Sequence, residues 1–513
     1  MLIRKRVRVA SVFNEGRDRD MSRDSTPNER KFRYVVIGAG MSGILAAIKL
    51  KQRGETDVVV YEKGHTIGGT WRENRYPGLT CDVPAHAYTY SFAPNPDWSA
   101  FYATGAEIQR YFQKVVEDHG IRALIDTDSE VVECVYNDAT RKWKLKLADG
   151  RTDSADVVIA ASGVLHHPNV AEIPGLQSFT GKAFHSARWD DAAEVDGRRV
   201  GVIGSGSTGV QIVTALQKRS ARVVHFQRSP QWIMPVQQFD YTEEDRAAFR
   251  ADPQLIDDMR YGEQYWSGIY RFNRALVDPE GSDMHEIEEL CRQNLENSIS
   301  DPVLREKLRP NYRAACKRLI YSWSYYDAVQ QPNVVVEIGA IDRVEPAGIR
   351  MRDGTFHELD VIVLATGFKV DRFIRPTIVK GKGGACLDDK WKGSPSAYYA
   401  ITIPDMPNFF MLNGPTGPVG NFSLIDIAER QWSYIEQLLQ HLRDANVAEI
   451  APTAEAMADY DSRRIAAART TIFASGCTSW YLDAEGVPIT WPWSYQTFAE
   501  EMDSPRFADY GLA

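Results

Sequence analysis

The chain of 513 residues is 43% hydrophobic and 25% charged, which is typical of a globular protein with two to four domains. Its net charge of −9 argues against a nucleic-acid-binding protein, because such domains are usually basic. No stretch approaches the ~20 consecutive apolar residues of a membrane-spanning helix, so we expect no transmembrane segment. The wide spacing of the cysteines, described below, favours reduced thiols, so we expect a location in the cytoplasm.

The chain begins with a polar segment, residues 1–30, which we expect to be a mobile N-terminal extension. Its first residues are basic, but it lacks the apolar core of a secretory signal, and acidic residues soon follow. Folded structure is therefore predicted to begin near residue 31.

The first motif is a glycine fingerprint in which Gly38, Gly40 and Gly43 follow a short apolar run. In a strand–turn–helix unit, such glycines allow a tight turn, close approach of the backbone to a pyrophosphate, and close helix–strand packing. Glu62 ends a second apolar run, 24 residues after Gly38. Because an acidic residue at this position binds the hydroxyls of an unmodified ribose, the unit is predicted to bind FAD.

A second fingerprint repeats this pattern with the opposite charge at its end. It contains Gly204, Gly206, Thr208 and Gly209. Arg228 lies 24 residues after the first of these glycines, again at the end of an apolar run. An arginine at this position favours a ribose that carries a 2′-phosphate, so the second unit is predicted to bind NADPH.

Two small-residue turns, 161–163 and 365–367, each follow an apolar run and resemble crossovers between nested domains. The predicted fold is α/β, with two Rossmann-like dinucleotide-binding domains. The NADP-binding domain is predicted to be inserted into a discontinuous FAD-binding domain. The predicted parts of the FAD-binding domain are 31–165 and 365–513. The NADP-binding domain is predicted to span 166–364, with a helical insertion at about 240–315 whose apolar residues recur with helical spacing.

The six cysteines are widely spaced and form no CxxC pair: Cys81, Cys134, Cys291, Cys316, Cys386 and Cys477. This spacing favours reduced thiols over a disulfide framework or a zinc site. The histidines, including His166 and His167, show no metal-ligand spacing, so no metal site is predicted. A flavin disulfide reductase also uses two nucleotide domains, but it needs a redox-active cysteine pair that the spacing does not provide.

A third motif, FxGxxxHxxxW, lies between the two fingerprints and contains Phe179, Gly181, His185 and Trp189. It resembles the fingerprint of the Baeyer–Villiger monooxygenases. Residues 68–82 likewise resemble the GGxWxxxxYPGxxxD motif of that family. The resemblance extends over about residues 32–500. The tryptophan that closes the motif distinguishes it from the related flavin monooxygenases that oxygenate nitrogen or sulfur.

The resemblance implies an enzyme that uses FAD and NADPH to insert one oxygen atom of O2 beside the carbonyl of a small-molecule ketone. The product would be an ester or lactone, formed through a C4a-peroxide of the reduced flavin. Two alternatives remain open: oxidation of nitrogen or sulfur by a flavin monooxygenase, and a non-catalytic sensor of flavin and NADP. The motifs specify neither the ketone nor the oligomeric state.

The resemblance also assigns roles to individual residues. Arg318 would be the active-site arginine, whose fixed positive charge stabilises anions formed during oxygenation, and Asp82 would pair with it. The residues expected to line the FAD are Thr70, Trp71, Asp82 and Tyr88. Those expected to bind the 2′-phosphate are Arg228, Ser229 and Lys317. Trp480 is expected at the nicotinamide, and His185 on the linker between domains rather than at the reacting carbon.

Overall fold

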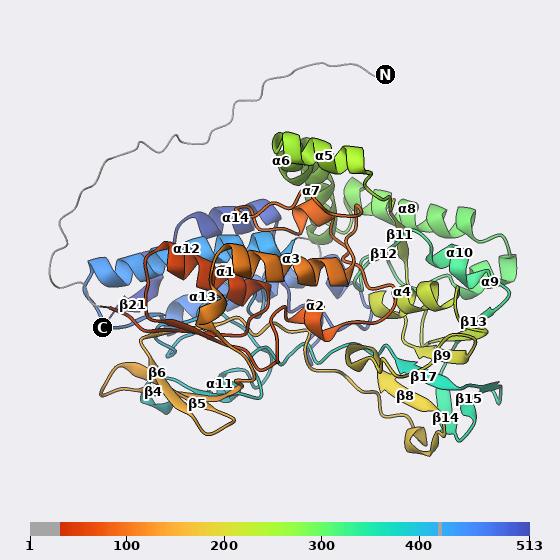
Figure 1. Ribbon diagram of the computed structural model, residues 1–513, viewed down its shortest axis with the longest axis horizontal. Helices are drawn as coiled ribbons and strands as arrows, with labels where there is room; N and C mark the ends of the chain where they lie inside the picture. The colour runs from red at the N-terminus through yellow and green to blue at the C-terminus, as the bar shows by residue number, and fades with distance from the viewer. Residues whose placement is uncertain (1–30, 419–422, 513) are drawn as a thin grey trace. The chain divides into compact units, whose positions relative to one another are not determined.

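Two parallel five-stranded sheets organise the chain (Figure 1). The computed structural model describes residues 31–418 and 423–512, so the expected N-terminal extension lies outside the described residues. The first sheet has the strand order β19-β7-β1-β2-β3, and the second has the order β13-β10-β9-β17-β8. The predicted α/β fold with two dinucleotide-binding units is confirmed.

The first sheet contains β1 (Tyr34–Ile37), β2 (Val58–Tyr61), β3 (Ile125–Asp126), β7 (Val157–Ala160) and β19 (Phe409–Met411). All residues of β1 and β7 are buried, because helices cover one face of this sheet and a smaller sheet, described next, covers the other. The accompanying helices are α1 (Met41–Gln52), α2 (Thr70–Glu73), α3 (Gly105–Asp118), α12 (Leu424–Asp444), α13 (Ala454–Ala468) and α14 (Tyr495–Asp503).

A smaller sheet packs against the first one and has the order β18-β4-β5-β6. Its strands are β4 (Val131–Asn137), β5 (Lys142–Leu147), β6 (Thr152–Ala155) and β18 (Ile378–Lys380). In β5, buried Trp143, Leu145 and Leu147 alternate with lysines, as expected for an antiparallel sheet with one face in the core. Three short elements lie elsewhere in this half: helix α11 (Leu387–Lys390) and the paired strands β20 (Ile450–Pro452) and β21 (Tyr510–Leu512).

The second sheet belongs to the unit that carries the second glycine turn. Its elements are β8 (Lys182–His185), β9 (Arg199–Ile203), α4 (Ser207–Leu216), β10 (Arg222–Gln227), β13 (Val334–Ile338) and β17 (Val361–Leu364). A hairpin sheet precedes β17 and contains β14 (Ile341–Glu345), β15 (Gly348–Met351) and β16 (Phe356–Glu358). The first sheet resumes only after β17, because β19 pairs with β7. The second unit is therefore inserted into the first; the exact domain boundaries stay predictions.

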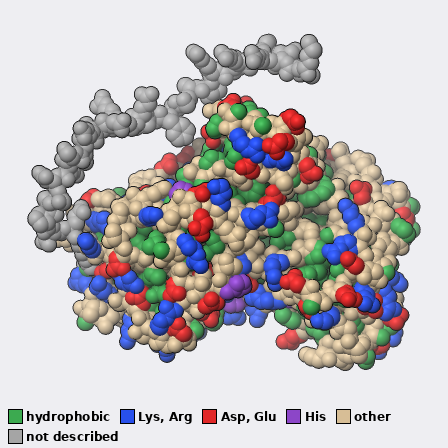
Figure 2. Space-filling model, in the orientation of Figure 1, with side chains coloured by type: hydrophobic (Ala, Val, Ile, Leu, Met, Phe, Trp, Pro, Cys, Tyr) green, Lys and Arg blue, Asp and Glu red, His purple; other side chains and the backbone are tan. Residues whose placement is uncertain are grey.

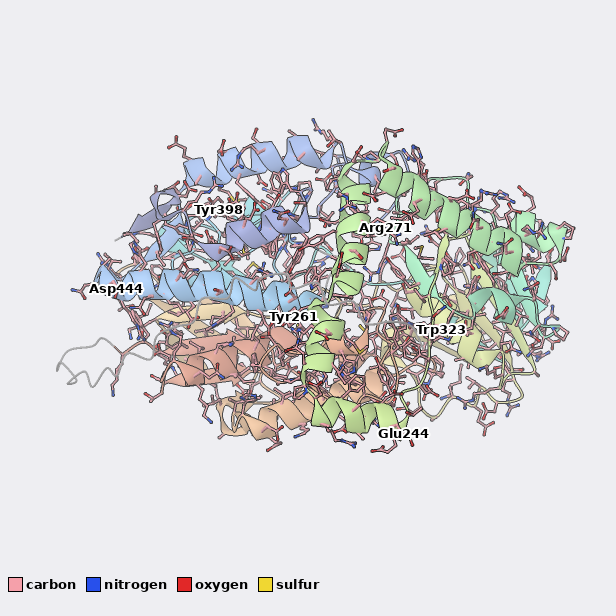
Figure 3. All side chains as sticks on the ribbon, turned by 90° about the horizontal axis from the view of Figure 1, so that it is seen from above. Glu244, Tyr261, Arg271, Trp323, Tyr398 and Asp444 are labelled. Carbon is pink, nitrogen blue, oxygen red and sulfur yellow. A yellow bond between two sulfur atoms is a disulfide. The ribbon has the colours of Figure 1, made fainter. Side chains whose placement is uncertain are left out.

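The helical insertion lies between β11 (Ile233–Pro235) and β12 (Ile320–Ser322), which pair in parallel. Its helices are α5 (Glu243–Ala251), α6 (Gln254–Tyr261), α7 (Glu263–Val277), α8 (Ser282–Ser298) and α9 (Pro302–Lys307); α10 (Tyr325–Val329) follows β12. In Figures 1 and 3, α5 to α7 lie over the region between the two sheets. These helices fall within the predicted insertion at about 240–315.

The two glycine turns have the same geometry. Gly38 and Gly204 adopt φ values of +101° and +125°, which L side chains rarely adopt. A Cβ on Gly43 would lie 1.8 Å from the carbonyl oxygen of Gly38, and one on Gly209 would lie 2.0 Å from that of Gly204. The third glycine of each fingerprint therefore permits the helix to pack against the preceding turn.

We predict that Gly43→Ala lowers the free energy of unfolding by about 3 kcal/mol, because the new methyl group overlaps backbone that cannot move aside. Gly268→Ala is the matched control, since Gly268 lies within α7 and a Cβ there would meet no atom within 4 Å. The Gly268→Ala variant should have a slightly higher midpoint of thermal unfolding, because alanine has a higher helix propensity than glycine. Differential scanning fluorimetry measures both, and equal midpoints for the two variants would contradict the packing argument.

Candidate active site

A cavity of about 1860 Å³ is lined by both sheets and by the helical insertion. Its walls include the glycine turns of both nucleotide-binding units, together with Glu62, Arg228, Asp82 and Arg318. The carboxyl ends of parallel strands commonly form such sites. On the surface, Figure 2 shows acidic and basic side chains interspersed over the described part of one face.

The first glycine turn fits the pyrophosphate of a dinucleotide such as FAD. Helix α1 begins at this turn with Gly40 as its N-cap, and it has neither a side-chain cap nor an acidic residue in its first turn. Its first N–H groups therefore point toward the turn without an anionic partner from the helix itself, which suits a bound phosphate. The Cα of Gly40 also lies only 3.0 Å from the position that a Cβ on Gly69 would take. Side chains are thus excluded where a ligand must approach the backbone.

Glu62 is held at the end of β2 by three hydrogen bonds. Its carboxylate accepts from the backbone N–H of Ala39 and of Gly64, and from Arg72, all at 2.7 Å. The side chain is buried yet lines the cavity. This position at the strand end fits the ribose of a dinucleotide bound at the first turn.

The second glycine turn offers an equivalent anion site at the start of α4, which also lacks a side-chain cap and acidic residues in its first turn. Beside it, Lys317 donates to the Ser229 hydroxyl at 3.0 Å. Burial and the nearby charge of Arg228 lower the pKa of Lys317. A dianionic 2′-phosphate would relieve this repulsion, so the residues present fit NADP.

Arg318 and Asp82 form an ion pair between the two nucleotide-binding units. The Arg318 Nη2 donates to the Asp82 Oδ2 at 2.6 Å, although 236 positions separate the two residues in the sequence. Burial lowers the pKa of Arg318, but the charges and hydrogen bonds of Asp82 and Tyr481 together outweigh burial and hold the pKa above its usual range. Both side chains line the cavity and are about one-quarter exposed. The site therefore contains a permanent cation with one carboxylate partner.

Thr70 and Trp71 begin α2 and line the cavity, as does Tyr88. The indole N–H of Trp71 donates to the Tyr88 hydroxyl at 3.1 Å, and the two rings meet edge to face. Burial raises the pKa of Tyr88, which stays a neutral hydrogen-bonding partner. Three of the four residues predicted beside the FAD, Thr70, Trp71 and Tyr88, thus line one part of the cavity.

The FxGxxxHxxxW motif lies outside the lining of this cavity. The His185 Nε2 lies 3.0 Å from the carbonyl oxygen of Gly367, and its Nδ1 accepts from the N–H of Ala187. Trp189 packs edge to face on Phe184. His185 therefore links β8 to the second crossover turn, an arrangement that supports a linker role over proton transfer to a substrate.

Trp480 lines the cavity with Thr478 and Ser479, and its ring lies 4.0 Å from that of Tyr481. Tyr481 itself was not singled out from the sequence. Its hydroxyl is a hydrogen-bonding neighbour of the Arg318 guanidinium. Only the tertiary contact reveals this role, because one buried tyrosine next to a tryptophan resembles ordinary core packing.

The expectation of reduced cysteines is wrong for one pair. Cys316 and Cys477 form a disulfide across 161 positions of sequence, whereas Cys81, Cys134, Cys291 and Cys386 are free thiols. The fold brings the pair together by packing the C-terminal segment against the residues that precede Arg318. Sequence spacing carries no signal for such a contact.

The helical insertion forms an aromatic wall of the cavity through Phe249, Tyr265 and Phe272, with Phe101 and Phe239 beside them. Figure 3 shows Tyr261 and Arg271 on the successive helices α6 and α7. Within residues 31–418 and 423–512, no cluster of side chains is suited to a metal ion, and no helix is long and apolar enough to cross a membrane.

Comparison with known proteins gives concordant matches. A sequence profile described as pyridine nucleotide-disulphide oxidoreductase matches residues 35–243. A protein of Mycobacterium tuberculosis described as an uncharacterised monooxygenase is 42% identical over 460 residues, which cover 90% of this chain and 92% of that protein. A Baeyer–Villiger monooxygenase of Streptomyces coelicolor is 38% identical over 484 residues, which cover 93% of this chain and 92% of that enzyme.

The fold is also similar to a solved structure, that of a cyclohexanone monooxygenase from a Rhodococcus species bound to NADP+. The TM-score is 0.83 at 29% identity, and the match covers 94% of this chain and 99% of that one. Sequence and structure thus agree over nearly the whole length of the chain. The protein belongs to the Baeyer–Villiger monooxygenase family and is an enzyme of this type.

Proposed function

We propose that the enzyme uses FAD and NADPH to insert one oxygen atom of O2 beside the carbonyl carbon of a small-molecule ketone, giving an ester or lactone. The observation that carries this proposal is the Arg318–Asp82 pair in a cavity shared by the two nucleotide-binding units. When bound, FAD and NADPH would supply the hydride transfer and the reaction with O2. The residues of the chain would orient these groups and stabilise charge.

Arg318 would stabilise the negative charge that develops on the carbonyl oxygen when the ketone is attacked. Its guanidinium keeps its proton, because its pKa is raised beside Asp82, and it donates through a planar fork. Asp82 orients this fork from the opposite unit through the hydrogen bond at 2.6 Å. A preorganised cation of this kind acts most strongly where water is excluded.

The helical insertion would provide that exclusion and the substrate wall. Helices α5 to α7 contribute apolar and aromatic side chains to the cavity, including Phe249, Tyr265 and Phe272. Apolar walls favour the hydrocarbon part of a ketone and remove water from the charged groups. Trp480, which also lines the cavity, would close its nicotinamide end.

We predict that Arg318→Ala abolishes ester formation, with a loss of about 100-fold or more, because the developing oxyanion loses its cation. FAD content and the rate of flavin reduction by NADPH should stay within the same order of magnitude. Stopped-flow absorbance follows the reductive half-reaction, and gas chromatography measures the ester. Arg313→Ala is the matched control, since Arg313 lies in the same segment but pairs with Glu288, outside the cavity lining. Normal ester yield per NADPH in Arg318→Ala would refute the assignment.

We predict that Arg228→Asp raises the KM for NADPH by about tenfold or more, the effect of losing a charge-assisted contact with the 2′-phosphate. The KM for NADH should change much less, because NADH lacks that phosphate. Arg222→Asp serves as the control, because Arg222 begins the same strand, is exposed and does not line the cavity. If Arg228→Asp weakens NADPH and NADH equally, the phosphate site lies elsewhere.

We predict that ketone substrates accelerate NADPH oxidation and yield esters or lactones with one oxygen atom from 18O2. A panel of cyclic, aryl and long-chain ketones, with a thioether and a tertiary amine included, identifies the reaction by product mass. Exclusive formation of a sulfoxide or N-oxide would favour the alternative reaction. NADPH oxidation that no compound in the panel stimulates would favour a sensor.

A further inference from the structure

The Cys316–Cys477 disulfide joins two segments that both reach the cavity. Cys316 directly precedes Lys317 and Arg318, and Cys477 directly precedes the cavity-lining residues 478–480. The two Cα atoms lie 6.1 Å apart, within the usual range for a disulfide. The bond therefore connects the segment of the active-site arginine to the segment of Trp480.

The C-terminal segment has few other anchors near the cavity. Between Ser475 and Trp480, only Cys477 is buried, while Thr478 and Trp480 are exposed. Just beyond it, buried Tyr481 packs on Phe473 and contacts Arg318. Cys477 and Tyr481 are thus the two points that fix residues 475–480, here called the nicotinamide loop.

Tyr481 lies in an apolar cluster that connects the two segments, and the disulfide joins Cys477 to the arginine segment. Ala314, Ala315 and Leu319 contribute from the arginine segment, and Ile472, Phe473 and Tyr481 from the C-terminal segment. Residues of α7 and α8, which form part of the substrate wall, complete the cluster. A change in the position of the nicotinamide loop would therefore be transmitted to Arg318 and to the insertion.

We propose that Cys316 and Cys477 form a redox modification site, in which the disulfide holds the nicotinamide loop closed over the NADP site and its reduction releases the loop. The inference rests on the proposed function for the chemistry that this loop serves. In compartments that keep thiols reduced, disulfides are usually transient or redox-sensing, which suits a bond that changes state rather than a permanent crosslink.

The oxidant that we assign to this site is hydrogen peroxide, which reduced flavin releases when it reduces O2 without oxygenating a substrate. One cysteine thiolate attacks the peroxide, the O–O bond breaks, and the resulting sulfenic acid condenses with the second thiol. Overall, two thiols and one H2O2 give one disulfide and two waters. Lys317 and Arg318 follow Cys316 directly, and positive charge favours the thiolate. A cellular dithiol would reverse the reaction by thiol–disulfide exchange.

The redox site would provide feedback when NADPH is oxidised without oxygenation of a substrate. Peroxide released in this cavity would oxidise the cysteine pair beside it, and the closed loop would then hold NADP and Arg318 in place. If release of the loop reduces the fraction of binding-competent protein to about one-tenth, the apparent Kd for NADP+ rises about tenfold.

The test uses the full-length holoenzyme in three states: oxidised with a small excess of H2O2, reduced with dithiothreitol, and as the variant Cys477→Ser. Differential alkylation and peptide mass mapping measure the 316–477 linkage. Flavin fluorescence titration measures the Kd for NADP+, and a peroxidase-coupled assay measures H2O2 per NADPH without added substrate. We expect the reduced protein and Cys477→Ser to bind NADP+ about tenfold more weakly and to release more H2O2, with FAD content unchanged.

Cys386→Ser is the control, because Cys386 is a partly exposed free thiol that does not line the cavity. It should respond to dithiothreitol as the wild type does, whereas Cys477→Ser should not respond. If the variant folds poorly, the oxidised and reduced wild-type protein give the same comparison. Equal NADP+ affinity in those two states overturns the proposal. So does the recovery of free thiols at both positions after peroxide treatment.

Two further outcomes distinguish this proposal from a disulfide reductase centre and from a failure of the proposed oxygenation. If anaerobic NADPH alone reduces the disulfide, the pair is a reductase centre rather than a tether, and the proposal fails. If no ketone is converted but NADP+ affinity follows the state of the disulfide, the proposed oxygenation fails while the tether stands. The affinity measurement needs no ketone, so the two failures are distinguishable.

Discussion

One ion pair connects the two halves of this enzyme at the point where the chemistry is expected. A guanidinium that is largely removed from water is costly unless a carboxylate compensates it, and breaking such a pair leaves an uncompensated charge. Arg318 comes from the inserted nucleotide unit and Asp82 from the surrounding one. The charge of the site and the link between the two units at the cavity therefore depend on the same contact, while other ion pairs, such as Arg188–Glu73, also join the units.

Hydrogen bonds between the units support this pair. The Tyr76 hydroxyl donates to the Gln211 Oε1 across the interface at 2.9 Å, and the Gln211 Nε2 in turn donates to Thr80, two positions before Asp82. His185 binds the carbonyl of Gly367 at the second crossover. Of these hydrogen bonds, the one at His185 belongs to the FxGxxxHxxxW motif, and it lies at a crossover between the units rather than in the lining of the cavity.

Most of the fold that was predicted correctly came from patterns that span only a few residues of sequence. The glycine fingerprints, with Glu62 and Arg228 at fixed spacing, predicted two strand–turn–helix units, because φ and helix packing act over a few residues. Helical periodicity likewise indicated the insertion. The resemblance to a known family, rather than spacing, supplied Arg318 and its partner. The disulfide and the role of Tyr481 were missed, and β18 was not predicted to join the small sheet, because each depends on segments that meet only in the tertiary structure.

The uncapped N-termini of α1 and α4 affect the stability of the protein in the absence of its cofactors. Helices α3 and α5 satisfy their first N–H groups with capping boxes, whereas the two helices at the glycine turns depend on an outside anion. A ligand that binds only the folded state stabilises it by mass action, by about 2.7 kcal/mol at 100 times its Kd. We therefore expect the folded protein to become more stable, and more resistant to proteolysis, as its two nucleotide sites fill.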